Sequence, residues 1–340
     1  MKKICLFVLV TTVVLISFNV RAQTTTKPIE LKYGEWSPPV SGVAKLDQKM
    51  LDMIMEKSQG KIKITSYFAE TLLKYADVFK GTQSGIADIS YWVIGTMGSP
   101  EKLSTVIRLP FNGINSMEMG TAVAEKLFRT NPELLLEYKD LEVLGFRSMP
   151  IYNVHTVKKP ISVPADMKGM KVIASGGWVD YARVTGAAPV SLPIGDYYIS
   201  LERGLVEGSY AHFPVCYIFK LLDVLKYHTV VKSSSIPDCF LINKNTWNSL
   251  SPDLQKIIRD AIQWRTEEIT RFDYEEEERA IDYAKKRGNK IYYPNADEMK
   301  LWYESAKPAH EIWIDKFEKE GLPARKIYEK LTQVVNDYKK

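Results

Sequence analysis

The sequence has few cysteines and few histidines. Three cysteines and four histidines occur among 340 residues. Cys5 lies in the N-terminal apolar run, which leaves Cys216 and Cys239 for the folded chain, and their spacing alone does not decide whether they pair. The histidines show neither an HExxH nor an H-x3-5-H spacing. We therefore expect no zinc site, and two thiols are too few to hold a metal.

A long apolar run is missing except at the N-terminus. Two lysines precede an apolar stretch over residues 4–18, and Val20 and Ala22 are the small residues at the two positions that a signal peptidase reads. This pattern is typical of a secretory signal peptide over residues 1–22, with cleavage after Ala22. A membrane anchor is the alternative, but the stretch is shorter than the ~20 apolar residues that a spanning helix needs. We therefore expect an exported protein.

Clusters of one charge and catalytic motifs are also scarce. The formal net charge is +5, and lysine and arginine are spread along the chain without a basic run interleaved with aromatics. Nucleic acid is therefore not an expected partner. The chain has no Walker loop, no G-x-G-x-x-G after a strand and no G-x-S-x-G elbow, since residues 81–85 (GTQSG) have the wrong spacing. These absences argue against a nucleotide-binding enzyme and a serine hydrolase.

The chain does contain an alternation of strand and helix patterns. Residues 144–214 read strand, helix, strand, helix, strand, with Gly or Pro at the breaks, which predicts a βαβ series on a largely parallel sheet. The same order occurs earlier in the chain. There the predicted strands cover residues 29–36, 61–68 and 85–93, and the predicted helices cover residues 43–57 and 72–84. At ~150 residues per domain, the length predicts about two α/β domains.

A helix of unusual length is predicted after Ser251. Ser251 is suited to the N-cap, Pro252 to the first helical position and Asp253 to the first turn. The helical pattern then continues with few breakers to about Gly288. A helix of this length can brace two lobes at once.

Several motifs occur in an order and at spacings that resemble a known family. They are EKSQGKIKI, GTQSGIADIS and RLPF in the first half, KKPISVPADMKGMKV and TGAAPVSLPIGDYYISLERGLVEG in the middle, and NKNTWNSLSPDLQKIIRDA at the long helix. The chain resembles the periplasmic solute-binding proteins of the tripartite ATP-independent periplasmic (TRAP) transporters, the DctP-like family. The resemblance covers nearly all of the chain after the signal peptide.

The resemblance implies an α/β fold of two lobes, a Venus-flytrap with hinge strands and with the long helix bracing both lobes. It implies a first lobe of residues 23–145 plus about 236–270, and a second lobe of residues 146–235 plus about 271–340 with the C-terminal helices. It further implies a protein of the Gram-negative periplasm with a small-molecule ligand in the interlobe cleft. The small and large membrane subunits of a TRAP transporter would be its partners, with no cofactor and no enzymatic activity.

The sequence departs from the family where a ligand carboxylate is usually held. In the family, a nearly invariant arginine follows the K-G-(L/M)-K step and forms a two-pronged salt bridge with the substrate, whereas Ile173 takes that position here. Asn153 occupies the place of a second arginine, and residues 209–212 (SYAH) replace the family's Q-E-N-P. The usual carboxylate clamp is therefore missing.

Aromatic residues gather at the predicted strand ends instead. An aromatic-lined cleft suits a planar or partly apolar solute, although each ring alone fits core packing equally well. A carboxylate in the cleft would need a partner, for which Arg147, Arg183 and His212 are candidates. Arg147 could instead form a surface or hinge salt bridge. Arg183 could instead be solvated on a helix. The predicted ligand-binding residues are Trp36, Tyr91, Trp92, Arg147, Asn153, Ile173, Trp178, Tyr210, His212 and Phe213.

The sequence thus predicts the solute-binding component of a TRAP transporter. We expect its solute to be a small organic acid, and an aromatic acid is one candidate. One alternative is an exported enzyme of unknown reaction on the same two-lobed fold. Another is a binding protein that serves a sensor instead of a transporter.

Overall fold

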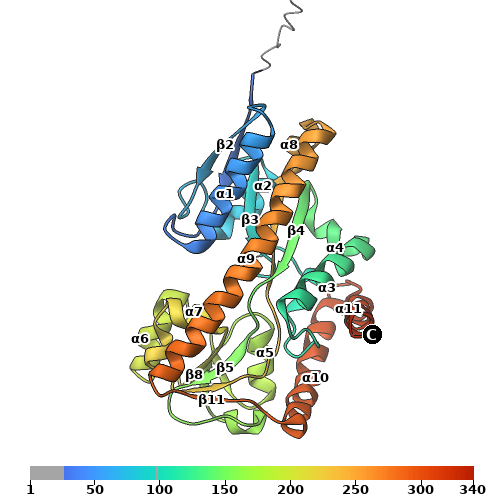
Figure 1. Cartoon of the computed structure of the whole chain (residues 1–340). Helices are drawn as coiled ribbons and strands as arrows, with labels where there is room; N and C mark the ends of the chain where they lie inside the picture. Colours follow the sequence, from blue (N-terminus) through green and yellow to red (C-terminus); the bar gives the residue numbers. More distant parts are fainter. Residues whose placement is uncertain (1–26, 97–98) are drawn as a thin grey trace, which may run out of the picture.

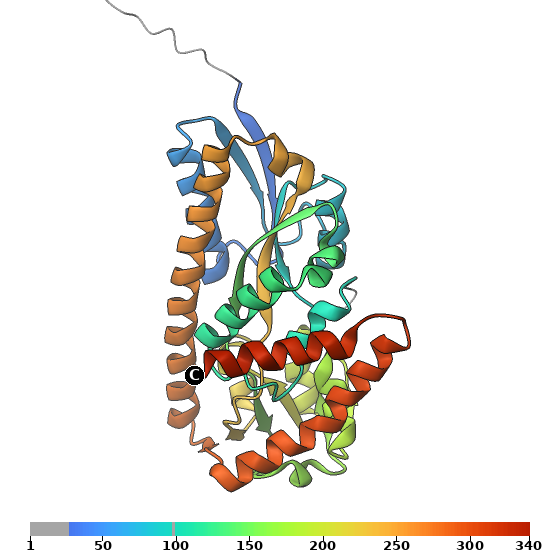
Figure 2. The same cartoon turned by 90° about the vertical axis from the view of Figure 1, so that its right-hand side faces the viewer.

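The computed structural model describes residues 27–96 and 99–340, which form two α/β parts one above the other (Figures 1 and 2). Each part contains a β-sheet, and the long helix α9 (Pro252–Lys286) runs along both. The predicted signal peptide lies outside the described residues. Among the residues that are described, no helix is both long enough and apolar enough to cross a membrane.

The first sheet contains, in order across it, β2 (Ile62–Tyr67), β1 (Ile29–Gly34), β3 (Ile89–Val93), β10 (Pro237–Asn243) and β4 (Leu141–Ser148). β1 is parallel to β2 and β3, while β10 is antiparallel to β3 and β4. Alternation sets which face of β2 is buried, because Ile62 and Ile64 enter the core and Lys63 and Thr65 face solvent. The chain passes from β4 to β5 (Asn153–Thr156) of the second part and returns from β9 (Tyr227–Thr229) to β10, so β4 and β10 have the place of hinge strands.

Helices cover both faces of the first sheet. On one face, α1 (Gly42–Lys57) and the first half of α9 share a core with β1, β2, β3 and β10. On the other face lie α2 (Val78–Gln83), α3 (Met117–Thr130) and the 3-10 turn η2 (Leu103–Arg108). α1 begins at Ser41, whose hydroxyl accepts a hydrogen bond from the Ala44 backbone N–H at 3.1 Å. Two short helices, α4 (Pro132–Leu135) and α8 (Lys244–Ser249), flank this part.

The second sheet contains, in order across it, β11 (Lys290–Tyr292), β9 (Tyr227–Thr229), β5 (Asn153–Thr156), β8 (Gly208–Ala211), β6 (Lys171–Ile173) and β7 (Ala188–Val190). β6 is parallel to β7 and β8, as the βαβ pattern predicts. β5 is antiparallel to β8 and β9, so this sheet is mixed, and the first strand of the predicted series lies partly in β4 of the other sheet. The helices of this part are α5 (Gly177–Val184), α6 (Tyr197–Glu202) and α7 (Phe213–Ile218). The remaining 3-10 turns are η1 (Tyr75–Asp77), η3 (Leu136–Tyr138), η4 (Pro164–Met167), η5 (Ile194–Asp196) and η6 (Leu221–Asp223).

The predicted long helix is present and contacts both parts. α9 has 35 residues, which corresponds to about 50 Å at the usual rise per residue. It packs against α1 and β4 in the first part and against α7 and β11 in the second. A single rigid element therefore spans the junction between the two sheets.

The C-terminal helices pack differently from the predicted division. α10 (Ala296–Glu318) starts against α5 in the second part, but its end enters the core of the first part. α11 (Ala324–Tyr338) packs against α3 and η2. Its apolar stripe, which includes Ile327 and Leu331, is buried in the first core, so this helix is a partner of the first sheet although residues 271–340 were expected with the second lobe.

The two cysteines lie in different cores. Cys216 is on α7 in the second part, and Cys239 is on β10 in the first. Both are buried free thiols. The pairing that the sequence left open does not occur in this structure, and burial raises the pKa of both thiols.

Candidate functional site

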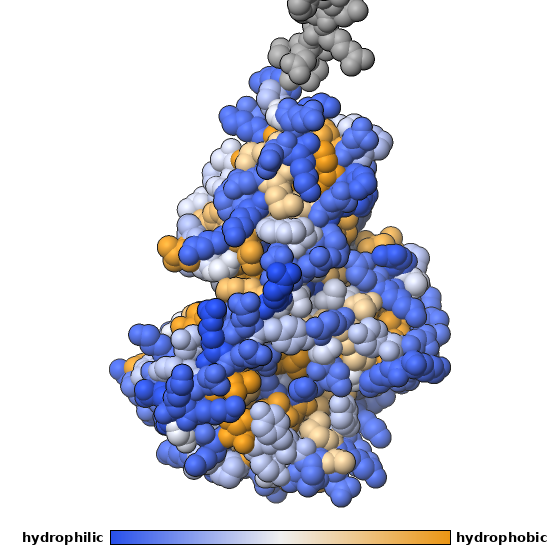
Figure 3. Space-filling view, in the orientation of Figure 1, coloured by the Kyte–Doolittle hydropathy of each residue, from blue (hydrophilic) through white to orange (hydrophobic). Residues whose placement is uncertain are grey.

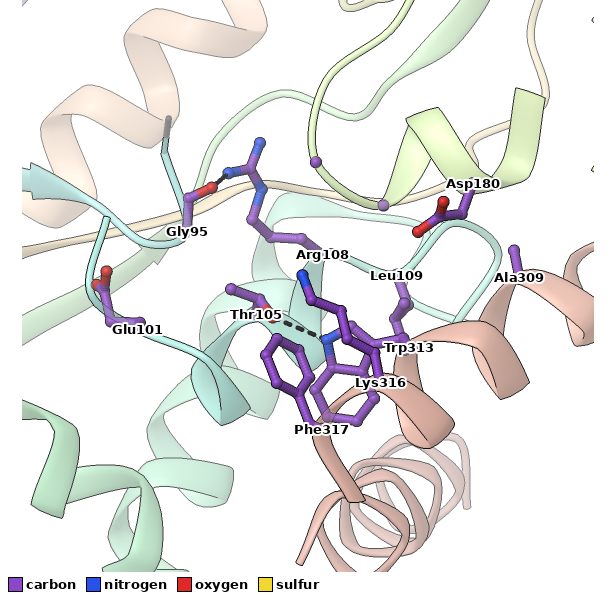
Figure 4. A pocket seen from close by; sticks show the side chains of 12 residues that line it. Gly95, Glu101, Thr105, Arg108, Leu109, Asp180, Ala309, Trp313, Lys316 and Phe317 are labelled. Atoms are coloured by element: carbon purple, nitrogen blue, oxygen red, sulfur yellow. Dashed lines mark hydrogen bonds between the residues drawn. The ribbon is translucent and has the colours of Figure 1, made fainter. Parts of the chain in front are cut away.

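A pocket lies between the two lobes. Its walls come from the loop after β3, from η2, from the first turn of α5 and from the second half of α10, and its volume is about 200 Å³ (Figure 4). The space-filling view shows the surface indented where the upper and lower parts meet (Figure 3). The loops after β3 and β6 supply opposite walls, and ligands of open α/β sheets bind beyond these carboxyl ends of strands.

Arg108, at the end of η2, is the buried cation of this pocket. It is 8% exposed, and its Nη1 donates to the backbone carbonyl of Ile94 at 3.2 Å and to that of Gly95. Figure 4 shows its side chain extending from η2 toward Gly95. Nε and Nη2 donate to no described residue. Neither is sealed from solvent, so both can still bond to a ligand. Burial lowers the pKa of Arg108, an effect that Tyr152, Tyr75 and Glu101 oppose.

The other two buried arginines among the described residues have carboxylate partners. Arg147 is bonded to Asp238, with Nε 2.9 Å and Nη2 2.6 Å from Oδ2, and its Nη1 donates to Asp273. Arg265 donates from Nε to Asp47 at 2.7 Å. Arg108 differs from both because no described carboxylate lies within 4 Å of it.

Glycines border the Arg108 side chain on two sides. A Cβ on Gly95 would lie 3.0 Å from Cδ of Arg108, and a Cβ on Gly176 would lie 3.5 Å from Nη2 and 3.6 Å from Cζ. Gly176 has φ +56°, in the region that favours glycine. The guanidinium therefore lies between the backbone of the loop after β3 and that of the loop after β6, with one loop from each lobe.

The remaining charged groups of the pocket leave it with an excess of positive charge. Glu101 accepts hydrogen bonds from Nε1 of Trp92 at 2.5 Å, from the Tyr138 hydroxyl at 3.1 Å and from Ser99. Burial, the largest effect, raises the pKa of Glu101 to about 7. Asp180 is paired with Arg183 at 3.0 Å. Lys316, on α10, is exposed and has no described carboxylate within 4 Å.

The rings that line the pocket itself are Trp313 and Phe317. Two further aromatic groups, one in each lobe, include Tyr75 and Tyr152, which are electrostatic neighbours of Arg108. In the first lobe, Tyr75 stacks on Trp92 with centroids 5.6 Å apart and meets the edge of Trp36 at 6.0 Å. In the second lobe, Trp178 stacks on Tyr210 at 4.3 Å and on Tyr152 at 6.3 Å. Trp36 is 40% exposed, and Tyr75 and Tyr152 are half-buried, so parts of these rings remain open to a ligand.

The comparisons with known proteins agree with this architecture. The family model described as bacterial extracellular solute-binding protein, family 7 (DctP) matches residues 35–319. The chain belongs to this family. It is 24% identical to the sialic acid-binding periplasmic protein SiaP of Vibrio cholerae over 286 residues, which cover 82% of this chain and 86% of that one. The resemblance predicted from the sequence motifs is thereby confirmed.

Solved structures show the same two-lobed fold. A TRAP solute-binding protein from Rhodoferax ferrireducens T118, in complex with copurified benzoate, has a TM-score of 0.79 at 22% identity and covers 92% of this chain and 98% of its own. One from a marine metagenome, described as specific for aromatic acids and solved with 3-hydroxybenzoate, has a TM-score of 0.80 at 22% identity, with coverage of 93% and 100%. The predicted α/β fold class is confirmed, and the chain is a solute-binding protein of the DctP family.

Several predicted residues of this DctP-family chain fall in the two aromatic groups. Trp36 and Trp92 belong to the group around Tyr75, and Trp178 and Tyr210 belong to the group around Tyr152. Of these four, only Trp36 is exposed, because Trp92, Trp178 and Tyr210 are packed in the cores. His212 contacts the second group, because its ring meets the edge of Tyr152 at 5.5 Å. His212 also caps α7, with Nδ1 accepting from the Val215 N–H at 3.2 Å. Burial lowers the pKa of His212 to about 3, so the ring is neutral with its proton on Nε2.

The other predicted residues lie in the hinge or in the cores. The Tyr91 hydroxyl donates to Asp238 at 2.8 Å, beside the Arg147 ion pair at the hinge. Asn153 accepts from the Lys232 N–H at 3.1 Å. Ile173 and Phe213 are packed in the core around α6 and α7.

Arg108 was not among the residues predicted from sequence. Its signal was present, because it directly precedes the Leu-Pro-Phe step of the RLPF motif. The motif predicts a loop, and a loop has no periodic pattern from which the buried side chains could be predicted. Arg108 is also 68 positions before Gly176, as the numbering shows, so only the folded chain reveals that the two are neighbours.

Proposed function

We propose that this chain is the periplasmic solute-binding component of a TRAP transporter, that its solute is an organic acid with a flat apolar body, and that it catalyses no reaction. The observation that most supports an acidic solute is the positive charge of the interlobe pocket. Arg108 and Lys316 have no described carboxylate partner there, while Glu101 is surrounded by neutral donors and its pKa is raised to about 7. These cations would attract an anion, and a carboxylate buried in the pocket needs a cation as its partner.

The ligands of similar proteins support an acid. SiaP of Vibrio cholerae is named for sialic acid, and the two solved structures hold benzoate and 3-hydroxybenzoate. All three are carboxylates. The half-buried rings of Tyr75 and Tyr152, both electrostatic neighbours of Arg108, favour the flat members of this class, since rings stack on planar groups.

The two-lobed construction supports delivery to a transporter. β4, β10 and α9 connect the lobes, so a ligand held between them favours the closed arrangement over the open one. We propose that the small and large membrane subunits of the transporter distinguish these arrangements. An exported enzyme on this fold is the second candidate, and the experiment below separates the two.

A thermal-shift panel tests the proposed function on the mature chain from Gln23. The acids are benzoate, 3-hydroxybenzoate, succinate, D-glucuronate and sialic acid, and benzamide and benzyl alcohol serve as neutral counterparts. An acid at about 100 times its Kd stabilises the fold by about 2.7 kcal/mol, which corresponds to a Tm increase of about 4 °C for a chain of this size. We expect such shifts with the aromatic acids and none with the neutral compounds.

Two results would contradict the proposal. Equal shifts with benzoate and benzamide, or no shift with any acid, would refute an acid-binding pocket. Mass spectrometry of the compounds after incubation should show them unchanged, and conversion of any of them would favour the enzyme instead.

A further inference from the structure

We propose that Arg108 is the carboxylate anchor of this chain, and that its Nε–Nη2 edge receives the carboxylate of an aromatic acid at the end of β6. The resemblance leads us to expect an anchoring arginine within that strand, but this chain has Ile173 there, buried in the core. Arg108 reaches the same end of the strand from η2, on the opposite side of the pocket. This inference rests on the proposed function and names the residue that replaces the missing clamp.

The hydrogen bonds of Arg108 leave one edge of the guanidinium free. A guanidinium offers five N–H donors in a planar fork, and a carboxylate bonds two neighbouring donors at once. Nη1 is occupied by the carbonyls of Ile94 and Gly95. Nε and Nη2 are adjacent donors on the other side, with no partner among the described residues. They form the pair that a carboxylate needs, and the carbonyl bonds hold the fork in place before a ligand arrives.

The space beside this edge is kept open by a glycine. The nearest atoms to a Cβ on Gly176 would be Nη2, Cζ and Nε of Arg108, at 3.5, 3.6 and 3.9 Å. A side chain there would cover the free edge. Gly176 also lies three positions after Ile173, which places the edge at the carboxyl end of β6.

The surrounding charge favours an anion at this point. α5 has eight residues and begins at Gly177, next to Gly176, so the positive end of its dipole faces the same region. Arg108 itself also favours an anion here. It is 8% exposed and has no acidic partner among the described residues. A buried guanidinium without a counter-ion is costly, and a bound carboxylate relieves that cost.

The neighbouring rings indicate the class of acid. Tyr75 from the first lobe and Tyr152 from the second are both electrostatic neighbours of Arg108. Each is already stacked on a tryptophan, Trp92 or Trp178, and so has a fixed plane. A carboxylate attached directly to a flat ring can reach the fork while the ring lies against these side chains.

The other cations near the pocket are less suitable. Arg147 has both carboxylates of the hinge as partners. Arg183 is exposed and paired with Asp180. Lys316 is exposed on α10 and offers a single ammonium group, which attracts an anion without fixing its plane. Arg265 also has two nitrogens, Nη1 and Nη2, without a described partner, but both are sealed from solvent, and Arg265 does not line the pocket. Arg108 alone among the described cations lines the pocket, is buried and keeps a pair of free donors that is not sealed off.

Isothermal titration of benzoate, 3-hydroxybenzoate, succinate and D-glucuronate tests the anchor in four proteins. They are the mature wild type, Arg108→Gln, Arg108→Lys and the matched control Arg271→Gln, which removes an exposed arginine from α9, away from the pocket. Loss of a buried ionic partner reduces affinity by about 30-fold or more. We expect that loss in Arg108→Gln for every acid that binds the wild type, about a 10-fold loss in Arg108→Lys, and a change within about twofold in Arg271→Gln.

The outcomes separate the anchor from the proposed function. If no acid binds the wild type, the proposed function fails and the anchor with it. If acids bind the wild type and Arg108→Gln binds them within about threefold, the function stands and the anchor is refuted. The melting temperature of each ligand-free variant shows whether it is folded. If Arg108→Gln does not fold, the folded Arg108→Lys decides: unchanged affinity overturns the fork geometry, and the expected loss supports it.

Discussion

Replacement of Arg147 by methionine should destabilise the protein strongly, because it leaves two carboxylates of the hinge without a cation. Asp238 is fully buried, and Asp273 is 8% exposed. Arg147 bonds both, and these contacts connect β4, β10 and α9 where the lobes meet. The Tyr91 hydroxyl would remain as a donor to Asp238. Neutral donors do not compensate two buried charges.

The size of the effect follows from the burial of the group. Removing one partner of a buried ion pair costs about 3–5 kcal/mol. A folded chain of about 310 residues unfolds with an entropy of roughly 0.65 kcal/mol per K, so this loss lowers Tm by about 5–8 °C. Burial raises the pKa of Asp273, and Arg147 is the main influence that lowers it. Without Arg147 that pKa rises further, so the variant should lose less stability at pH 5 than at pH 8.

Scanning calorimetry of Arg147→Met at both pH values measures the loss. Arg271→Met is the matched control, because Arg271 pairs with Glu268 on the exposed face of α9 at 3.1 Å. Such exposed pairs contribute about 0–1 kcal/mol, so the control should melt within about 2 °C of the wild type. A Tm decrease of less than 2 °C for Arg147→Met at pH 8, or an equal loss at pH 5, would refute the assigned role of this ion pair.

Two further predictions concern other buried titratable groups. Burial lowers the pKa of His155 to about 4, below its usual 6.5, and its neutral Nδ1 lies 2.8 Å from Nδ1 of His228. Unfolded chains therefore bind more protons as the pH falls from 6.5 to 4, and His155 alone accounts for up to about 3 kcal/mol of the stability lost in that window. His212 and His228, whose pKa values burial also lowers, add to the loss in the wild type. Urea unfolding should show a smaller loss in His155→Gln than in the wild type, and an equal loss would contradict the prediction. Burial raises the pKa of Glu35 to about 7, so its contribution to stability is present below pH 4.5 and lost as the pH rises through 7. Glu35→Gln should therefore raise the free energy of unfolding by about 2–3 kcal/mol at pH 8.5 and by much less at pH 5, and equal effects at both values would count against it.

The fold could be predicted from the sequence because its signals are local. Alternation in residues 61–68 and the Ser-Pro-Asp start of α9 are signals that span a few positions, and the motif order added the family. Ser251 is at the N-cap of α9, although its side chain makes no capping hydrogen bond. The division into lobes was less accessible. α11 has an apolar stripe that any core could cover, and only the structure shows that η2 and α3 cover it.

The site depends on contacts between residues far apart in sequence. The loss of the strand arginine at Ile173 could be seen in sequence, but its replacement could not, since η2 and the loop after β6 meet only in the folded chain. Arg147 was a candidate for the ligand, with a hinge salt bridge as the alternative. Its partner Asp238 lies 91 positions away in sequence, and the structure places the two in contact.

A crystal structure of the mature chain soaked with benzoate or 3-hydroxybenzoate, whichever gives the larger thermal shift, would show directly whether Arg108 binds the carboxylate of the acid. The acid should lie between the lobes, with its carboxylate oxygens at hydrogen-bonding distance from Nε and Nη2 of Arg108 and its ring beside Tyr152. Density for the acid at another place, or with its carboxylate away from Arg108, would contradict the account.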